Sequence, residues 1–295
     1  MTTEHQQAEA LTNTTRDDAP GVIATDAVIA IDHVSMTFTG RDASQSVQAL
    51  DDVSLDIRKG EFVCLLGPSG CGKSTLLSII GGLTQPTAGS VTIAGTKVDR
   101  PRPRDVAFVF QESTLLPWYT VLENFRLALK FQGIADAAWR DRAMHSLSVV
   151  GMEQFANHYP RQLSGGMKQR INLARGLCVG TEVLLLDEPF ASLDEQTRMV
   201  LGEDLSMLLA RTGKTIVFVT HSLAEAVFLA DRIVVMTARP GRIKASINVR
   251  EPHPRSPDFM LTGEFGAIRN DLYALLRDEI RATVKRMREA RDARG

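Results

Sequence analysis

The pattern of apolar and polar positions predicts a core of buried strands. Apolar and polar residues alternate over residues 28–34, as expected for a strand with one buried face. A second strand signal covers residues 54–57 and ends at the turn Lys59-Gly60. Continuous apolar runs, which are typical of strands buried on both faces, follow at residues 62–66, 183–186 and 215–219.

The segments between these strands have helical patterns. Residues 111–180 are mostly helical in pattern, and another helix-like stretch separates the last two apolar runs. Strands that alternate with helices predict an α/β fold with a largely parallel sheet. The helical stretch in the middle then predicts an α-helical lobe, at about residues 112–178, inserted into that core.

The two ends of the sequence differ from this core. Residues 1–27 are rich in Thr, Gln, Asp and Ala without any period, which predicts a disordered tail. The main domain is expected over residues 28–248, and residues 249–295 are expected to form a linker and an amphipathic helix. The apolar positions of that helix recur mostly at steps of three and four residues: Ile268, Leu272, Leu275, Leu276, Ile280, Val284 and Met287.

Composition and charge exclude several classes of protein. The formal net charge of the 295 residues is -1, so no global basic field points to nucleic acid as a partner. Cys64, Cys71 and Cys178 are too scattered for a disulfide framework or a zinc site and are expected to be free thiols. No apolar run approaches the ~20 residues that cross a bilayer, so a role at a membrane requires docking onto another chain.

A glycine-rich segment follows the first continuous apolar run. Residues 67–74 read Gly-Pro-Ser-Gly-Cys-Gly-Lys-Ser, which is the phosphate-loop pattern. Glycines let successive backbone N–H groups turn towards phosphate oxygens, and the dipole of the following helix adds a favourable field. In this pattern Lys73 reaches the β- and γ-phosphates, and the Ser74 hydroxyl is a ligand of Mg²⁺. The predicted nucleotide-binding residues are Gly67, Pro68, Ser69, Gly70, Cys71, Gly72, Lys73, Ser74 and Thr75.

Two acidic residues end the second apolar run. Burying Asp187 and Glu188 at a strand end is costly unless they face a site. We expect Asp187 to hold Mg²⁺ and Glu188 to act as the general base for an attacking water. His221 follows the third run, at the strand end where ligand sites of α/β proteins form, and is expected to contact the γ-phosphate. The alternative is that these acids mark an ordinary solvated strand end. The presence of a phosphate loop in the same chain favours the functional interpretation.

A second helix start also carries glycines. Ser164 can cap a helix that begins with Gly165 and Gly166, because the apolar residues that follow share one helical face. Two glycines at a helix start can expose backbone N–H groups to an anion. A plain capped helix is the alternative. However, this chain already has a phosphate loop, so a second helix start that suits an anion requires an explanation.

With these segments in order, the sequence resembles the ABC ATPase family from about residue 28 to residue 243. The further residues that match family motifs are Phe38 (the aromatic that stacks on adenine), Gln111 (Q-loop), Ser164, Gly165 and Gly166 (signature), Asp194 (D-loop) and His221 (switch histidine). The resemblance implies a P-loop NTPase core of the ABC type, with a RecA-like mixed sheet and an inserted helical lobe. It also implies ATP and Mg²⁺ as cofactors, with Ser74, Gln111 and Asp187 around the metal.

The same resemblance implies an assembly. Two ATPase subunits, identical or paired, sandwich two ATP molecules head to tail. Ser164 and Gly166 then contact the γ-phosphate of the ATP that the partner's phosphate loop holds.

A narrower resemblance concerns the ATPases of nitrate, sulfonate and taurine importers. It is carried by the Pro117-Trp118 pair after the Q-loop and by the Arg-Pro-Gly turn at residues 239–241. It implies transmembrane permease subunits, a separate solute-binding protein and a peripheral position on the cytoplasmic face of the cell membrane. An importer ATPase for another small solute is the first alternative, a soluble ABC ATPase the second and a non-catalytic nucleotide-binding module the third. The transported solute is not expected to touch this chain.

Overall fold

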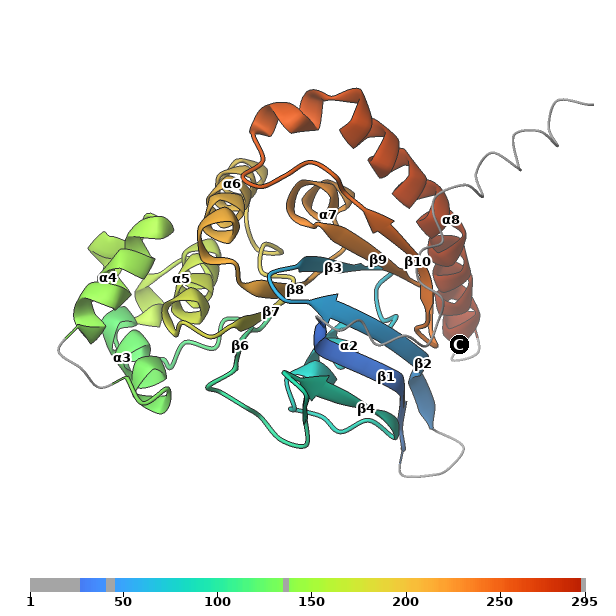
Figure 1. Cartoon of the computed structure of the whole chain (residues 1–295), viewed down its shortest axis with the longest axis horizontal. Helices are drawn as coiled ribbons and strands as arrows, with labels where there is room; N and C mark the ends of the chain where they lie inside the picture. Colours follow the sequence, from blue (N-terminus) through green and yellow to red (C-terminus); the bar gives the residue numbers. More distant parts are fainter. Residues whose placement is uncertain (1–26, 41–45, 135–137, 293–295) are drawn as a thin grey trace, which may run out of the picture.

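The computed structural model describes residues 27–40, 46–134 and 138–292, with the side chains of residues 208, 209 and 284–292 excepted. Figure 1 shows a central body of sheets and helices, with a helical lobe on one side and a long C-terminal helix on another. The predicted N-terminal tail lies outside the described residues, apart from Ala27. The predicted domain boundaries stay predictions.

A six-stranded sheet forms the centre of the molecule, in the order β10-β9-β3-β8-β7-β6. All neighbouring strands are parallel except β10 and β9. The three continuous apolar runs form β3, β7 and β8, whose residues are all buried. The predicted α/β fold with a mixed, largely parallel sheet is therefore confirmed. The six strands are β3 (Phe62–Leu66), β6 (Val106–Val109), β7 (Val183–Asp187), β8 (Thr215–Thr220), β9 (Arg232–Met236) and β10 (Ile243–Asn248).

A second, antiparallel sheet lies below the first in Figure 1, in the order β2-β1-β4-β5. Its strands are β1 (Ala27–Phe38), β2 (Val47–Arg58), β4 (Ala88–Ile93) and β5 (Thr96–Lys97). The predicted strand at residues 54–57 is only the second half of β2. The apolar pattern did not predict β4, β5, β6, β9 or β10. β10 alternates between half-buried and exposed positions and so gives a weak signal, whereas β6 lies in an apolar run at residues 106–110 and could have been predicted. β9 carries an apolar run at residues 233–236, so the sequence could have predicted this strand as well.

The helices are α2 (Lys73–Ile80), α3 (Val121–Phe131), α4 (Trp139–Val149), α5 (Gly165–Cys178), α6 (Glu195–Thr212), α7 (Leu223–Leu229) and α8 (Gly263–Asp292). Short 3₁₀ turns lie at η3 (Glu153–Phe155), η4 (Pro160–Gln162) and η5 (Pro257–Leu261). The chain leaves the central sheet after β6, forms α3, α4 and α5, and returns at β7. These three helices form the predicted α-helical lobe, on the left of Figure 1.

The residues of the central strands alternate between two apolar cores. Val63 and Leu65 of β3 point to the core between the central sheet, α2 and the antiparallel sheet. Phe62, Cys64 and Leu66 point to the core on the other face, which the remaining helices cover. This is why β3 is continuously apolar: both of its faces are buried.

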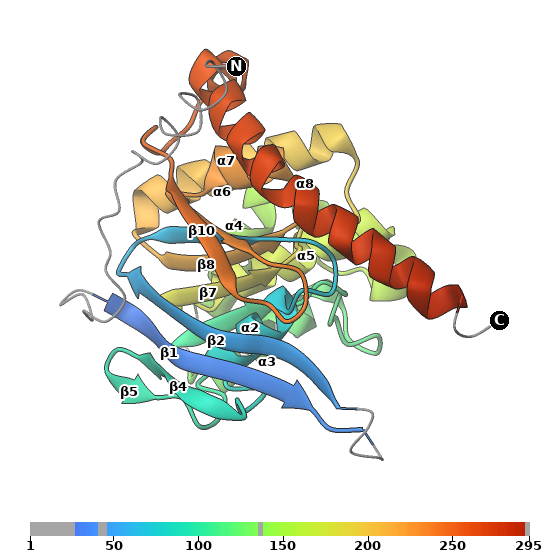
Figure 2. The same ribbon diagram turned by 90° about the vertical axis from the view of Figure 1, so that its right-hand side faces the viewer.

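The helix α8 crosses the side of the molecule, where Figure 2 shows its whole length. Its predicted apolar stripe is buried at Leu272 and Leu276, but Ile280 is 45% exposed. No described helix has the length and apolar character needed to cross a membrane.

Candidate active site

The phosphate loop connects the end of β3 to the start of α2. Gly70 and Gly72 have positive φ angles of 75° and 103°, a conformation that side-chain-bearing residues rarely adopt. A Cβ atom at Gly72 would lie 2.7 Å from Leu50 Cδ2 and 2.8 Å from the carbonyl oxygen of Ala49. Glycine is therefore required at this position both by the backbone conformation and by the close approach of β2.

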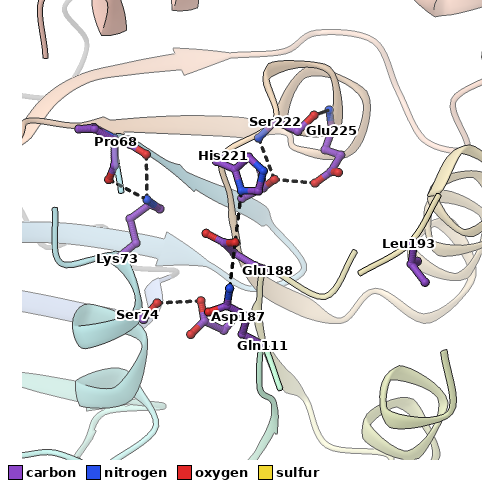
Figure 3. A network of polar contacts seen from close by, with 12 residues as sticks. Pro68, Lys73, Ser74, Gln111, Asp187, Glu188, Leu193, His221, Ser222 and Glu225 are labelled. Carbon is purple, nitrogen blue, oxygen red and sulfur yellow. Dashed lines mark hydrogen bonds and ion pairs between the residues drawn. The ribbon is translucent and has the colours of Figure 1, made fainter. Parts of the chain in front are cut away.

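The side chain of Lys73 is buried at the first position of α2. Its ammonium group donates hydrogen bonds to the carbonyl oxygens of Gly67 (2.8 Å) and Pro68 (3.1 Å), as Figure 3 shows. A buried cation is costly unless it is paired or hydrogen-bonded. These carbonyls hold the ammonium group inside the curve of the phosphate loop.

Asp187 and Ser74 lie next to each other, although they come from β7 and α2. The Ser74 hydroxyl donates a 2.9 Å hydrogen bond to Oδ1 of Asp187. Burial raises the pKa of Asp187, and the neighbouring Glu188 raises it further, whereas the hydrogen bond from Ser74 lowers it. A hydroxyl and a carboxylate side by side provide the oxygen ligands that Mg²⁺ prefers, so this pair fits the predicted metal. Among the described residues, no group of three or more His, Cys, Asp and Glu side chains is placed to hold a metal ion.

Glu188 adopts an unusual backbone conformation, with φ at 44°. Positive φ in a residue other than glycine is strained and is found most often at functional sites. The Glu188 N–H donates to the carbonyl oxygen of Val219 in β8 (3.0 Å), which holds this turn against the sheet. The turn directs the carboxylate beyond the strand end, into the site.

Two side chains from other loops converge on the Glu188 carboxylate. Its Oε2 atom lies 3.4 Å from Nε2 of Gln111 and 3.2 Å from Nδ1 of His221 (Figure 3). His221 precedes α7, whose first turn is capped by the Ser222 hydroxyl. The Thr220 hydroxyl accepts from the Ser222 N–H (3.0 Å) and so fixes the backbone on both sides of His221. Three predicted catalytic residues from separate loops therefore meet at one point.

An open pocket of about 460 Å³ lies against these groups. Of the predicted site residues, Phe38, Ser69, Gly70, Gly72, Lys73, Ser74, Thr75, Gln111, Glu188 and His221 line it. The described lining does not include Gly67, Pro68, Cys71 or Asp187, all of which are buried. Cys71 is buried, as are the other two cysteines, and all three are free thiols. Burial raises the pKa of the Cys71 thiol.

The remaining predicted residues lie away from this pocket. Ser164 caps α5 by accepting from the Met167 N–H (3.3 Å), and a Cβ atom at Gly165 would meet open space. Asp194 caps α6 by accepting from the Thr197 N–H (2.9 Å). The two helix starts are adjacent, because a Cβ atom at Gly166 would lie 3.3 Å from Leu193 Cδ2. The structure thus brings the predicted signature and D-loop together, but not with the phosphate loop of the same chain.

Three pocket residues were not predicted as site residues: Val47, Ala49 and Arg239. Val47 and Ala49 belong to β2 and carry no chemical signal. Arg239 belongs to the Arg-Pro-Gly turn, which the sequence singled out only as a mark of relatedness. The turn lies more than a hundred residues from the phosphate loop in the sequence, so nothing in the sequence indicated that Arg239 lies at the pocket.

Comparison with known proteins agrees with this geometry. The ABC transporter family matches residues 50–191. The taurine import ATP-binding protein of Rhizobium johnstonii is 40% identical, over 90% of this chain and 100% of that protein. The nitrate import ATP-binding protein of Synechocystis sp. is 43% identical, over 75% of this chain and 82% of that protein.

A solved structure of an ATP-binding cassette has the same fold as this chain. A dimeric ATP-binding cassette in a post-hydrolysis state, bound to ADP and Pi, superposes with a TM-score of 0.69. It is 37% identical in sequence and covers 76% of this chain and 99% of its own. The phosphate loop, the paired acids at the end of β7 and these likenesses lead to one conclusion: the chain belongs to the ABC transporter family, as an ATP-binding subunit that hydrolyses ATP.

Proposed function

We propose that this chain energises a membrane importer for a small anion such as nitrate, a sulfonate or taurine. The observation that carries the hydrolytic part is the convergence of Gln111 and His221 on the Glu188 carboxylate, at the wall of the pocket that Lys73 faces. The importer part is supported by the relatives, which are named as ATP-binding proteins of taurine and nitrate import.

In the proposed mechanism the phosphate loop binds the triphosphate. Its backbone N–H groups and the Lys73 ammonium group compensate the phosphate charge, and Phe38, 47% exposed at the pocket, stacks on the adenine. Ser74, Asp187 and Gln111 are the residues that would hold Mg²⁺, whose charge would stabilise the phosphate oxygens. The Ser74 and Asp187 oxygens are already within hydrogen-bonding distance of each other, so little rearrangement is needed.

Glu188 acts on the attacking water. As the water oxygen forms its bond to the γ-phosphorus, the Glu188 carboxylate accepts one proton from it, and the bond to the β-phosphate oxygen breaks. His221, 3.2 Å from the same carboxylate, orients that water and contacts the γ-phosphate. Gln111 lies in the loop that leads from β6 to α3. A contact between Gln111 and the γ-phosphate would therefore couple ATP binding to the position of the helical lobe.

The open helix start at Gly165 supports a paired arrangement. Ser164, Gly165 and Gly166 would contact the γ-phosphate of an ATP held by a second subunit, and Asp194 would lie at the same interface. The dimeric state of the solved relative supports this pairing. Each of the two ATP sites is then formed by the phosphate loop of one subunit and the signature residues of the other.

The loop after Gln111 would receive the permease. Trp118 is 66% exposed on this loop, and exposed aromatic side chains often anchor interfaces. We propose that a transmembrane permease docks there, with a separate solute-binding protein delivering the solute, so that this chain lies on the cytoplasmic face of the membrane. An importer for a different small solute is the second candidate, since no described feature of the pocket recognises a transported solute.

Growth of a deletion strain tests the proposal. The strain is supplied with nitrate, taurine or an alkanesulfonate as the sole nitrogen or sulfur source. Loss of growth on one of them, restored by the wild-type chain and not by Glu188→Gln, is the expected result. Normal growth on all three would reject this solute class while leaving the ATPase assignment intact.

A further inference from the structure

The turn between β9 and β10 forms a wall of the nucleotide pocket, although none of the predicted site residues belongs to it. Arg239 of this turn lines the pocket together with Ser69 and Gly70 of the phosphate loop. Its Nε atom donates a 3.2 Å hydrogen bond to the carbonyl oxygen of Gly70. A Cβ atom at Gly70 would lie 3.3 Å from Arg239 Nη2, so the guanidinium group packs directly on the loop.

The turn is also pressed against the phosphate loop by its backbone. A Cβ atom at Gly241 would lie 2.1 Å from the carbonyl oxygen of Cys71, which no larger residue could tolerate. The Gly241 N–H donates to the carbonyl oxygen of Ala49, and its own carbonyl accepts from the Asp51 N–H (3.0 Å). Both contacts are with β2, the strand that provides Val47 and Ala49 to the pocket. The turn therefore joins the phosphate loop to β2.

The C-terminal helix α8 makes polar contacts with this turn and with the start of β10. One oxygen of Glu279 on α8 accepts a 2.8 Å hydrogen bond from the N–H of Ala238, the residue before Arg239. The other oxygen lies 2.7 Å from the Lys244 ammonium group at the start of β10. Lys244 also donates to the carbonyl oxygen of Leu275, one turn earlier on α8 (2.9 Å). Figure 2 shows α8 running alongside this hairpin.

These contacts are partly shielded from solvent. The side chains of Lys244 and Glu279 are 28% and 18% exposed, and Ala238 is buried. Hydrogen bonds to a charged group are stronger than those between neutral groups, and screening weakens them less when they are buried. A chain of direct contacts thus leads from Glu279 through Ala238 and Arg239 to Gly70.

We propose that Glu279 and Arg239 are positioning residues for the phosphate loop, and that α8 sets the affinity for ATP through the turn at residues 237–242. Glu279 fixes the turn, and Arg239 fixes the Gly70 carbonyl, so the loop keeps its N–H groups turned towards the phosphates before ATP binds. A loop that is already ordered loses less conformational entropy on binding. This inference rests on ATP binding at the phosphate loop.

Titration of the full chain with a fluorescent ATP analogue and Mg²⁺ tests the proposal. Glu279→Gln retains the shape but removes the charge, and Arg239→Ala removes the guanidinium group. Each is expected to weaken nucleotide affinity about fivefold to tenfold, since Arg239→Ala loses the charge-assisted bond to Gly70 and Glu279→Gln weakens the bonds that hold the turn. The KM for ATP should rise by the same factor, with kcat within about twofold of the wild type, because neither residue touches the reacting atoms.

Two comparisons make the test specific. Asp278→Asn alters the adjacent carboxylate of α8, which faces Arg277 and Arg281 instead, and should leave affinity unchanged. The double variant Arg239→Ala/Glu279→Gln should weaken affinity by less than the product of the two single effects, because both act on one turn. Multiplicative effects, or a lower melting temperature with unchanged affinity, would overturn the proposal.

Lys73→Ala separates this inference from the proposed function. If Lys73→Ala abolishes binding while the Glu279 and Arg239 variants bind like the wild type, the positioning role is wrong and the ATP site stands. If Lys73→Ala binds like the wild type, the ATP site itself is wrong.

Discussion

The two glycine-bearing helix starts of the chain are built differently. At the start of α2, Lys73 is buried against backbone carbonyls, Ser74 bonds to Asp187, and Lys73 and Ser74 both line a pocket. At the start of α5, Ser164 is exposed, and a Cβ atom at Gly165 would meet nothing within 4 Å. The first start is surrounded by its own chain, and the second faces outward.

This difference is consistent with the proposed arrangement, in which each ATP site is divided between two subunits. A helix N-terminus favours an anion wherever it occurs, but affinity requires further donors and exclusion of water. The start of α2 has those neighbours within the chain. Among the described residues, the start of α5 has the D-loop beside Gly166 and open space at Gly165, so in the proposed arrangement a second chain supplies the rest.

Glu188→Gln should have the largest effect. The amide keeps the shape of the side chain but cannot accept the proton of the attacking water, so ATP turnover should fall about 1000-fold. Nucleotide binding should remain, and the variant should accumulate as an ATP-bound dimer, because hydrolysis no longer separates the subunits. Turnover assays and size-exclusion chromatography with ATP measure both effects. Turnover within a few-fold of the wild type would remove Glu188 from its proposed role.

Lys73→Ala should weaken ATP binding about 100-fold, since the triphosphate loses its main charge-assisted partner within the chain. Because Lys73 lies in the phosphate loop at the start of α2, the loss of affinity should already be measurable in the isolated subunit. Equilibrium titration with a fluorescent ATP analogue measures it. An unchanged affinity would contradict the assignment of residues 67–75 to the phosphates.

Ser164→Asp tests the outward-facing half. Aspartate caps a helix as well as serine does, so the melting temperature should stay within about 2 °C of the wild type. Its negative charge would face the partner's γ-phosphate, and turnover should fall about 30-fold through repulsion, with ATP affinity of the isolated subunit unchanged. The neutral cap Ser164→Thr is the matched control. A loss of affinity in the isolated subunit would argue that this helix start serves its own chain.

Trp118→Ala should have the smallest effect on the isolated subunit. Its side chain is 66% exposed, so the free energy of unfolding should change by less than about 0.5 kcal/mol and basal turnover by less than about twofold. Capture of the permease and solute uptake should both decrease. Phe131→Ala, which alters a residue 71% exposed at the end of α3, is the control for general loss of apolar surface. Normal capture by Trp118→Ala would reject the proposed docking site.

Much of the fold could be predicted because its central strands are buried on both faces. Continuous apolar runs at β3, β7 and β8 are hard to explain otherwise, and the helical lobe follows from the long stretch between them. The strands that escaped prediction include the short β6 and the edge strand β10. β10 buries too little apolar surface to give a clear pattern, and its pairing with β9 holds it in place, whereas the apolar residues of β6 could have indicated a strand.

The local chemistry could be predicted from consecutive residues: the glycines of the phosphate loop, the acids that end β7 and the cap of α5. These are local because a turn, a strand end or a helix start depends on a few consecutive residues. Only the tertiary structure decided that His221 and Gln111 meet at Glu188, and that Glu279 and Arg239 support Gly70. Those contacts join residues 33 to 169 positions apart, and such distances are closed by the packing of the whole core rather than by any local pattern.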